Sequence, residues 1–493
     1  MPSQLSSESE ALSPKATADV KRRSTNFKLS IWGDYFLSYA SMEVDSTLEQ
    51  KVQQLKEEVK RMLVDNVKDG SQKLSLIDDI QRLGVSYHFE NEICEILQQI
   101  YDNDHVSYDD LHQNNSDLHA VSLRFRLLRQ QGYNASCVKY FSNLKDNDGK
   151  FKESLVDDTK GLLGLYEATH LRIHGDDILD EALTFTTTHL ESATRRGLSS
   201  PLSKQVTHAL NQPFWKGMPR IEARHYISTY QEDKYSHNET LLNFARLDFN
   251  LLQQLHQKKL CELTRWWKDL DFVKKLPFTR NRLVECYFIA LGIFFEPEYY
   301  FGRRTFCKVI YMLSAIDDIY DVHGTLEELD SSMKLFRGLN QLIPYHVKII
   351  MWDISSLDQS PDYMKVCFQA QLDVFTEIEE KLASGGNVYA IHHARESREH
   401  AASAVELYMK EHGATEEEAI VELTNQVNDA WKVIIKACLH PTPFPLPVLM
   451  RPLRVASTWE VLYKSADSYT SPGAEFKGIV TSLLIEHVPN ALA

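Results

Sequence analysis

The sequence predicts an all-α protein built from two large helical domains. Apolar residues recur at spacings of three and four through most of the chain, as in helices that bury one face. The N-terminal half has no long alternation of polar and apolar residues, which argues against sheets. At 493 residues the chain is too long for one hydrophobic core, and its 43% of hydrophobic residues can fill two.

The amino-acid composition argues against some classes of partner and indicates the cellular compartment. The net charge of −15, from 54 basic and 69 acidic residues, argues against nucleic acid as the main partner. The seven cysteines are odd in number and scattered without a C-x-x-C pair, which predicts reduced thiols. No apolar run approaches the ~20 residues of a membrane span. We expect a cytoplasmic monomer with no membrane span.

Two features mark the N-terminal end. Residues 1–21 are rich in serine and predict a disordered tail, because they offer little apolar surface to bury. A plastid transit peptide is usually longer and poorer in acids than this tail. Arg22 and Arg23 follow, with eight residues between them and Trp32. This segment is either a basic stretch before an anchoring tryptophan, or an arm that lays two guanidinium groups over an anionic ligand.

Helices are expected throughout residues 22–232, the predicted N-terminal domain. In 45–66 apolar residues recur at spacings of four, three, four and three. Further helices are expected at 74–101, 117–131, 155–170, 176–195 and 202–211. This half lacks a D-x-D-D cluster that could protonate an alkene, so we expect its role to be structural. The polar segment 230–238 predicts the boundary to a C-terminal domain at 233–493.

The C-terminal domain opens with a long helix that is expected to end near Trp266 and Trp267. A short loop then carries Arg280 and Arg282 and leads into an apolar helix at 283–295. Two arginines at this spacing can hold a phosphate group bidentately. The alternative is a solvated basic turn, which is the commoner use of such a pair.

The strongest chemical signal is a group of aspartates, Asp317, Asp318 and Asp321, at the end of a largely apolar helix. At roughly 100° per residue, Asp317 and Asp321 share a face and Asp318 lies beside them. The helix dipole is negative at this end, so a cation should offset the three acids. Hard oxygen ligands at this density favour Mg²⁺ over zinc or copper.

The same D-D-x-x-D pattern occurs once more, at Asp176, Asp177 and Asp180. Here the acids begin a helix, where the dipole favours negative charge. We interpret this copy as helix capping. Context separates the two copies, since the pattern is the same.

These motifs, in this order and spacing, resemble those of plant class I terpene synthases. Flanking segments agree with the same family: residues 30–34, 123–129, 166–170 and 283–288. The likeness covers about residues 20–394 and resumes from about 395 to the end. Within the family, the chain most resembles the cytosolic sesquiterpene synthases of flowering plants.

The resemblance implies a vestigial α-barrel-like N-terminal domain and a C-terminal α-bundle that holds the active site. It implies a prenyl diphosphate substrate, farnesyl diphosphate for a sesquiterpene synthase or geranyl diphosphate for a monoterpene synthase. Mg²⁺, with Mn²⁺ as the alternative, would be held by Asp317 and Asp321 with Asp318 assisting. Other residues are assigned to binding or catalysis by the same analogy: Arg22, Arg23 and Trp32 at the N-terminal arm, Arg280 and Arg282 at the diphosphate, and Tyr463, Asp467 and Tyr469 at the far wall and the closing loop.

Three departures from the family pattern stand out. Ile289 replaces a tryptophan that is common after Tyr287 and Phe288, and about a dozen extra residues lie between 329 and 352. At the junction 394/395 the family has several tens of further residues, including the second metal motif (N/D)-D-x-x-(S/T)-x-x-x-E. The nearest match, at Asn428-Asp429, has lysines at 432 and 436 in place of the hydroxyl and the carboxylate. We therefore expect impaired or absent catalysis, from a mispredicted or alternatively spliced gene, and core surface left exposed.

Four other interpretations have to be weighed. Zinc at His392, His393, Glu396 and His400 lacks an H-E-x-x-H pattern, so a solvated surface is favoured. A prenyl-chain-elongating enzyme should carry its second aspartate-rich motif in the same domain, whereas the copy at 176–180 lies in the other half. A helical scaffold is disfavoured because no repeat of 30–50 residues appears. A catalytically dead synthase that still binds diphosphate stays open.

Overall fold

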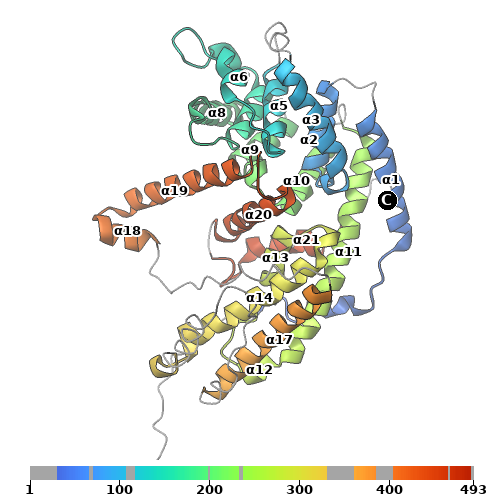
Figure 1. Ribbon diagram of the computed structural model, residues 1–493, viewed down its shortest axis with the longest axis vertical. Helices are drawn as coiled ribbons and strands as arrows, with labels where there is room; N and C mark the ends of the chain where they lie inside the picture. The colour runs from blue at the N-terminus through green and yellow to red at the C-terminus, as the bar shows by residue number, and fades with distance from the viewer. Residues whose placement is uncertain are drawn as a thin grey trace, which may run out of the picture. The chain divides into compact units, whose positions relative to one another are not determined.

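The computed structural model describes residues 30–65, 70–106, 117–197, 200–232, 237–329, 360–384, 404–464 and 467–489. These residues form helices joined by turns, and the only strand-like pairing among them is an isolated bridge between Lys145 and Phe151 (Figure 1). The predicted all-α class is confirmed. Within the described residues no helix is long and apolar enough to cross a membrane. All seven cysteines are described, and none forms a disulfide.

The N-terminal half is made of nine helices among the described residues, most of them close to the predicted positions. They are α1 (Ser46–Val64), α2 (Gly70–Arg82), α3 (Glu90–Val106), α5 (Leu118–Gln130), α6 (Cys137–Phe141), α7 (Thr159–Thr169), α8 (Asp177–Arg196), α9 (Ser200–Asn211) and α10 (Pro219–Glu232). Two helices, α6 and α10, were not expected, and the single helix expected at 74–101 is wrong. It is divided into α2 and α3, and Gly84 lies in the break at a φ of +77°. A Cβ on Gly84 would lie 2.6 Å from Ala223 Cβ, so the close approach of α10 requires glycine there.

The C-terminal half is made of longer helices. They are α11 (Glu239–Leu270), α12 (Phe272–Lys275), α13 (Leu283–Ile293), α14 (Tyr300–Asp318), α17 (Asp362–Ser384), α18 (Ala404–His412), α19 (Glu416–Ala437), α20 (Leu446–Tyr463) and α21 (Ala474–Leu484). α14 continues into η7 (Ile319–His323), a turn of π-helix. The predicted boundary at 232/233 falls between α10 and α11, and it stays a prediction.

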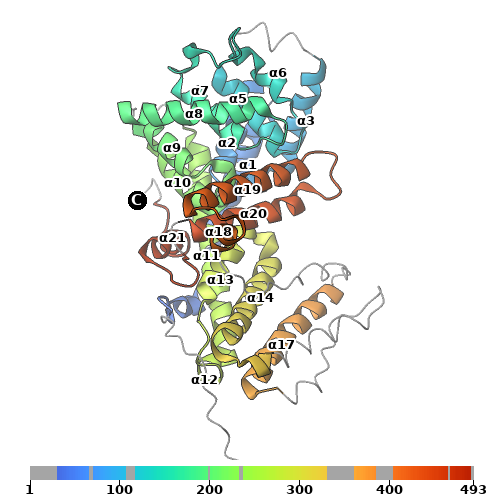
Figure 2. The same ribbon diagram turned by 90° about the vertical axis from the view of Figure 1, so that its left-hand side faces the viewer.

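By their contacts the residues group into two compact units, which we describe separately. Among the described residues, unit 1 holds Ser30, 270–281, 312–329 and 360–373, and unit 2 holds those within 31–269, 282–311 and 374–489. In unit 2, α7 packs against both α5 and α8, and α13 packs against α20. Figure 2 shows α19 beside α20, which also pack together.

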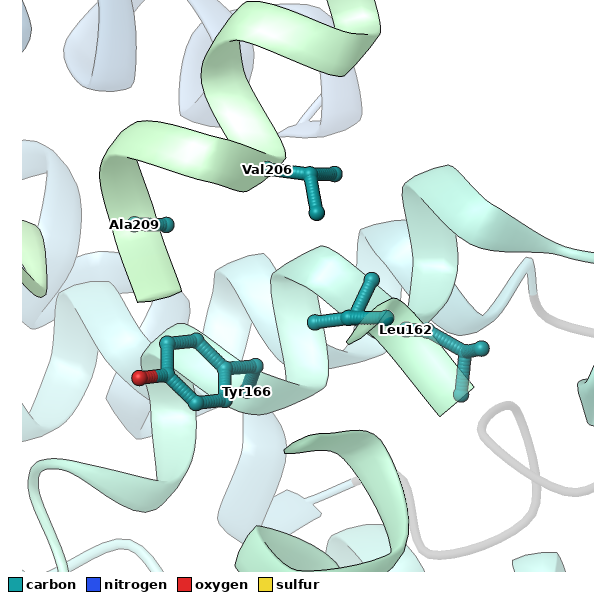
Figure 3. Close-up of a cluster of buried hydrophobic side chains, with 5 residues drawn as sticks. Leu162, Tyr166, Val206 and Ala209 are labelled. Carbon is teal, nitrogen blue, oxygen red and sulfur yellow. The ribbon is translucent and has the colours of Figure 1, made fainter. Parts of the chain in front are cut away.

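Burial of apolar side chains holds unit 2 together. One cluster joins α7, α8 and α9 and is made of Leu162, Tyr166, Leu190, Val206 and Ala209 (Figure 3). A leucine or valine side chain contributes about 1.5–3 kcal/mol when it is fully buried. Caps fix where helices begin: the side chain of Asp45 accepts hydrogen bonds from the first N–H groups of α1, and Thr415 with Glu418 forms a capping box at α19.

Candidate active site

The predicted aspartates lie where α14 ends and η7 begins. Asp317 and Asp318 are the last two residues of α14, and Asp321 lies in the π-turn. The environment of each carboxylate differs: the side chain of Asp317 is 54% exposed, that of Asp318 is fully buried, and Asp321 is half-buried. The prediction that Asp317 and Asp321 share a face assumed a regular α-helix, whereas Asp321 lies in a wider π-turn.

Arg280 is the cation that offsets two of these acids. Its Nη2 donates to Asp317 Oδ2 over 2.9 Å, and its Nε lies 2.6 Å from Asp318 Oδ1. The backbone N–H of Arg280 donates to Asp318 Oδ2 over 2.6 Å. Burial raises the pKa of Asp318 to about 6, and the interactions with Arg280 oppose that rise. Arg280, Asp317 and Asp318 all belong to unit 1, so their ion pairs lie within one compact unit.

Two of the three aspartates have carboxylates suited to a hard divalent cation, and the third is paired within the protein. Asp317 and Asp321 offer carboxylate oxygens, the ligand type that Mg²⁺ prefers. Asp318 is buried against Arg280 and so is used within the protein. Among the residues that the structure describes, no three His, Cys, Asp or Glu side chains are grouped closely enough to hold a metal by themselves. A metal held here would take further ligands from its substrate or from water, as Mg²⁺ commonly does.

Arg282 has a different role from Arg280 although it lies only two residues later. It is fully buried at the start of α13, and its Nη2 donates to the carbonyl oxygen of Thr470 over 2.8 Å. The Oδ1 of Asp467 accepts from the backbone N–H groups of Tyr469 and Thr470 and so shapes the same loop. The structure therefore places Arg282 against the loop of Asp467 and Tyr469, the segment that was predicted to close the site.

Two residues of α13 next to this loop, Glu285 and Cys286, were not predicted as site residues. Tyr469 places its hydroxyl 3.4 Å from the Sγ of Cys286 on α13. Glu285 is fully buried, and burial raises its pKa to about 7, while a backbone hydrogen bond and the charge of Arg282 oppose the rise. A glutamate inside the otherwise apolar helix 283–293 is the signal that could have identified it. Trp32 itself is buried, as the anchoring interpretation predicts.

The remaining predicted residues are more peripheral or lie outside the description. Tyr463 is the last residue of α20, with its side chain 49% exposed and its ring 5.7 Å from that of Trp459. Arg22, Arg23, the histidines near 392–400, most of the extra residues between 329 and 352 and the junction 394/395 all lie outside the described residues.

The second D-D-x-x-D copy is used for structure. Asp176 stands at the N-cap position of α8, but its side chain makes no hydrogen bond to the first turn of that helix, so the capping interpretation is wrong in detail. Its carboxylate lies 3.2 Å from Arg129 and accepts from the N–H of Ile173. Asp180 lies 2.6 Å from Arg172 and 3.1 Å from Lys432 on α19. This copy therefore pairs with basic side chains and links α8 to α19.

The sequence matches two family profiles. Residues 31–210 match the N-terminal domain of terpene synthases, and residues 268–397 and 390–433 match the metal binding domain of the terpene synthase family in two pieces. The chain is 47% identical to (-)-germacrene D synthase of Vitis vinifera, over 97% of this chain and 98% of that protein. It is 40% identical to valencene synthase of Vitis vinifera and to (+)-delta-cadinene synthase isozyme XC14 of Gossypium arboreum, over 99% of this chain and 100% of each relative.

Solved structures agree with these relatives. Limonene synthase with 2-fluorolinalyl diphosphate superposes with a TM-score of 0.82 at 28% identity, over 95% of this chain and all of that chain. Isoprene synthase from grey poplar leaves, solved with three Mg²⁺ ions and dimethylallyl-S-thiolodiphosphate, gives a TM-score of 0.79 at 29% identity, over 93% of this chain and 99% of that chain. The identity over the full length, the two profiles and the shared helical fold lead to one conclusion: this chain belongs to the terpene synthase family.

Proposed function

We propose that this chain is a sesquiterpene synthase by descent whose reaction is the Mg²⁺-dependent ionisation and cyclisation of farnesyl diphosphate, and that an internal deletion impairs this reaction. The observation that carries the proposal is the ion-paired group of Arg280, Asp317 and Asp318 at the end of α14, in a chain whose similar relatives are plant sesquiterpene synthases. We place the protein in the cytoplasm, in keeping with seven cysteines that form no disulfide.

Each residue has a defined part in this reaction. Bound at Asp317 and Asp321, Mg²⁺ would supply Lewis-acid stabilisation of the leaving diphosphate. When the allylic C–O bond breaks, its electron pair leaves with the diphosphate, and ring closure and loss of a proton consume the resulting carbocation. Arg280 is already oriented by Asp318 and would bind the diphosphate oxygens. Arg282 and Asp467 would hold the loop of Tyr469 in place.

Two observations support the internal deletion. The alignment with germacrene D synthase spans 568 positions, 75 more than this chain has residues, although it includes 97% of the chain. The metal binding family profile matches in two pieces that meet at 390–397, around the junction 394/395. We infer that the second metal motif is missing there. A synthase that binds diphosphate without turnover is the second candidate function, and the same gap favours it.

The test is incubation of purified full-length protein with Mg²⁺ and either farnesyl or geranyl diphosphate, with gas chromatography of the extract. Asp317→Ala removes the exposed ligand, and Asp177→Ala makes the same change in the other D-D-x-x-D copy as a matched control. We expect little or no product from the chain as it stands, together with Mg²⁺-dependent binding of inorganic diphosphate that Asp317→Ala abolishes and Asp177→Ala leaves intact. Turnover at the rate of an intact synthase would refute the impairment, and equal loss in both variants would refute the role of Asp317.

A further inference from the structure

Three aromatic rings meet beside the π-turn, and they come from three separate parts of unit 1. Phe278 precedes Arg280 by two residues, His323 ends η7, and Tyr363 lies in the first turn of α17. The rings of Phe278 and His323 stack with centroids 3.8 Å apart and an interplanar angle of 6°. Tyr363 stands edge-on to both, at 5.8 Å from Phe278 and 4.7 Å from His323. We call Phe278, His323 and Tyr363 the aromatic clamp.

Hydrogen bonds through the hydroxyl of Tyr363 also hold the aromatic clamp in place. The hydroxyl of Tyr363 donates to Glu328 Oε2 over 2.9 Å. The same Glu328 oxygen accepts from the backbone N–H of Thr325 over 3.0 Å, and the N–H of Glu328 donates to Thr325 Oγ1 over 3.3 Å. Tyr363 of α17 therefore contacts this region twice: its hydroxyl bonds to Glu328 after η7, and its ring contacts His323 at the end of η7.

The π-turn itself needs such support. Its wide bond runs from the N–H of Gly324 to the carbonyl oxygen of Ile319, five residues earlier, over 2.7 Å. Turns of this kind are rare, and they persist where surrounding contacts determine them. Ile319 and Val322 are buried, so one side of the turn is fixed by packing. A Cβ on Gly324 would lie 3.0 Å from that carbonyl oxygen and 2.7 Å from Leu329 Cδ2, so Gly324 is closely packed against the turn.

We propose that Phe278 and Tyr363 are positioning residues that hold η7 in the π form through His323 and thereby set where Asp321 lies relative to Asp317. The inference rests on the proposed function, because it concerns the metal that Asp317 and Asp321 would share. In an α-helix, residues four apart lie on one face. In the π-turn an extra residue is taken up, so the direction of Asp321 depends on keeping that turn. Phe278 also belongs to the Arg280 loop, so one contact fixes the arginine and the distal aspartate together.

The test compares Phe278→Leu with two other variants of the full chain. Phe278→Leu keeps apolar volume but removes the stacked ring, and Phe278→Tyr keeps the ring as the conservative rescue. Phe151→Leu is the matched control, since Phe151 stacks on Phe185 in unit 2, with centroids 5.0 Å apart at 22°. Two readouts are taken: amide hydrogen exchange of residues 319–324, and Mn²⁺ affinity in the presence of inorganic diphosphate, followed by electron paramagnetic resonance.

We expect Phe278→Leu to speed exchange in 319–324 and to weaken Mn²⁺ binding, each by about three- to tenfold, in line with the loss of one aromatic pair. Phe278→Tyr and Phe151→Leu should match the wild type in both. Tyr363→Leu removes two ring contacts from another segment and should have the same effect. It replaces Phe278→Leu as the test if that variant does not fold. Unchanged exchange would overturn the clamp, and faster exchange with unchanged Mn²⁺ affinity would overturn its positioning role. A wild type that binds no Mn²⁺ would refute the proposed metal site and the positioning role with it, whereas the exchange data would still judge the clamp.

Discussion

Neighbouring aspartates at the end of α14 do different work because one is exposed and the other is buried. Asp317 meets Arg280 at the surface, where an ion pair contributes little to stability. Asp318 meets the same guanidinium inside the protein, where removal of one partner leaves a buried charge without compensation. A D-D pair in sequence therefore separates into a candidate ligand and a structural acid.

This division predicts opposite results for two alanine variants. Asp318→Ala should lower the free energy of unfolding by about 3–5 kcal/mol, because Arg280 loses its buried partner. Asp317→Ala should lower it by no more than about 1 kcal/mol, while Mg²⁺-dependent binding of diphosphate is lost. Urea unfolding and calorimetric titration measure the two effects. Equal destabilisation by both variants would contradict the division.

Glu285 predicts a specific dependence of stability on pH. Its pKa is raised to about 7 in the folded protein, from an ordinary value near 4.5, because it is buried. Between these two values the folded state binds more protons than the unfolded state, so this group lowers the free energy of unfolding as pH rises through the window. The slope from one such group is at most about 1.4 kcal/mol per pH unit.

The measurement is urea unfolding of the wild type and of Glu285→Gln at pH 5, 6, 7 and 8. The variant should gain stability relative to the wild type as pH rises from 5 to 7, because glutamine cannot ionise. Glu417→Gln, a change at an exposed glutamate of α19, should run parallel to the wild type. A difference between Glu285→Gln and wild type that does not vary with pH would show that Glu285 does not titrate in this range.

At the scale of elements, α19 has apolar side chains that are buried in one part of the helix and exposed in another. Trp431 and Ile435 are buried, and Lys216 lies over the ring of Trp431, 5.1 Å from its centroid. The nearby salt bridge of Lys432 and Asp180 joins α19 to α8. Towards its beginning, the same helix leaves Ile420 and Val427 exposed, at 48% and 57%. The apolar stripe of α19 thus continues beyond the surface that covers it.

Substitution along α19 should follow this pattern of burial. Trp431→Ala should lower the free energy of unfolding by about 3–5 kcal/mol, because it opens a cavity where a large side chain is buried. Val427→Ala, one turn earlier, should change it by less than about 0.5 kcal/mol, as is usual for an exposed position. Thermal and urea unfolding of both variants provide the comparison. A large loss in Val427→Ala would mean that another part of the protein covers this side of α19.

At the scale of the whole molecule, the alignment with germacrene D synthase spans 75 more positions than the chain has residues, 568 against 493. Exposed apolar side chains gather on the segments that follow the junction: Ile420, Val421, Val427 and Val433 on α19, Phe444 before α20, and Val448 within it. Soluble proteins seldom leave many large apolar side chains together at the surface without a reason. Helices that pack on these faces in an intact synthase would be the reason here.

On the proposed deletion, inserting the corresponding segment of a relative should cover these side chains and increase the rate of catalysis. We expect a chain with the corresponding segment of germacrene D synthase inserted between residues 394 and 395 to bind less of the dye ANS and to convert farnesyl diphosphate at least a hundredfold faster, equivalent to about 2.7 kcal/mol of transition-state stabilisation. An inserted Gly/Ser linker of equal length is the control. Equal activity of the original and restored chains would show that the deletion is not what limits catalysis.

The sequence by itself determined the helical class, most of the helices and the family, because these depend on the spacing of apolar residues and on short motifs along the chain. It also located Arg280, Arg282 and the aspartates at 317–321. Tertiary structure alone decided that Asp318 is buried against Arg280, that Asp321 lies in a π-turn and that Asp180 pairs with Lys432. Burial, turn register and pairing over more than 200 residues depend on what packs against each side chain, and no local pattern encodes that.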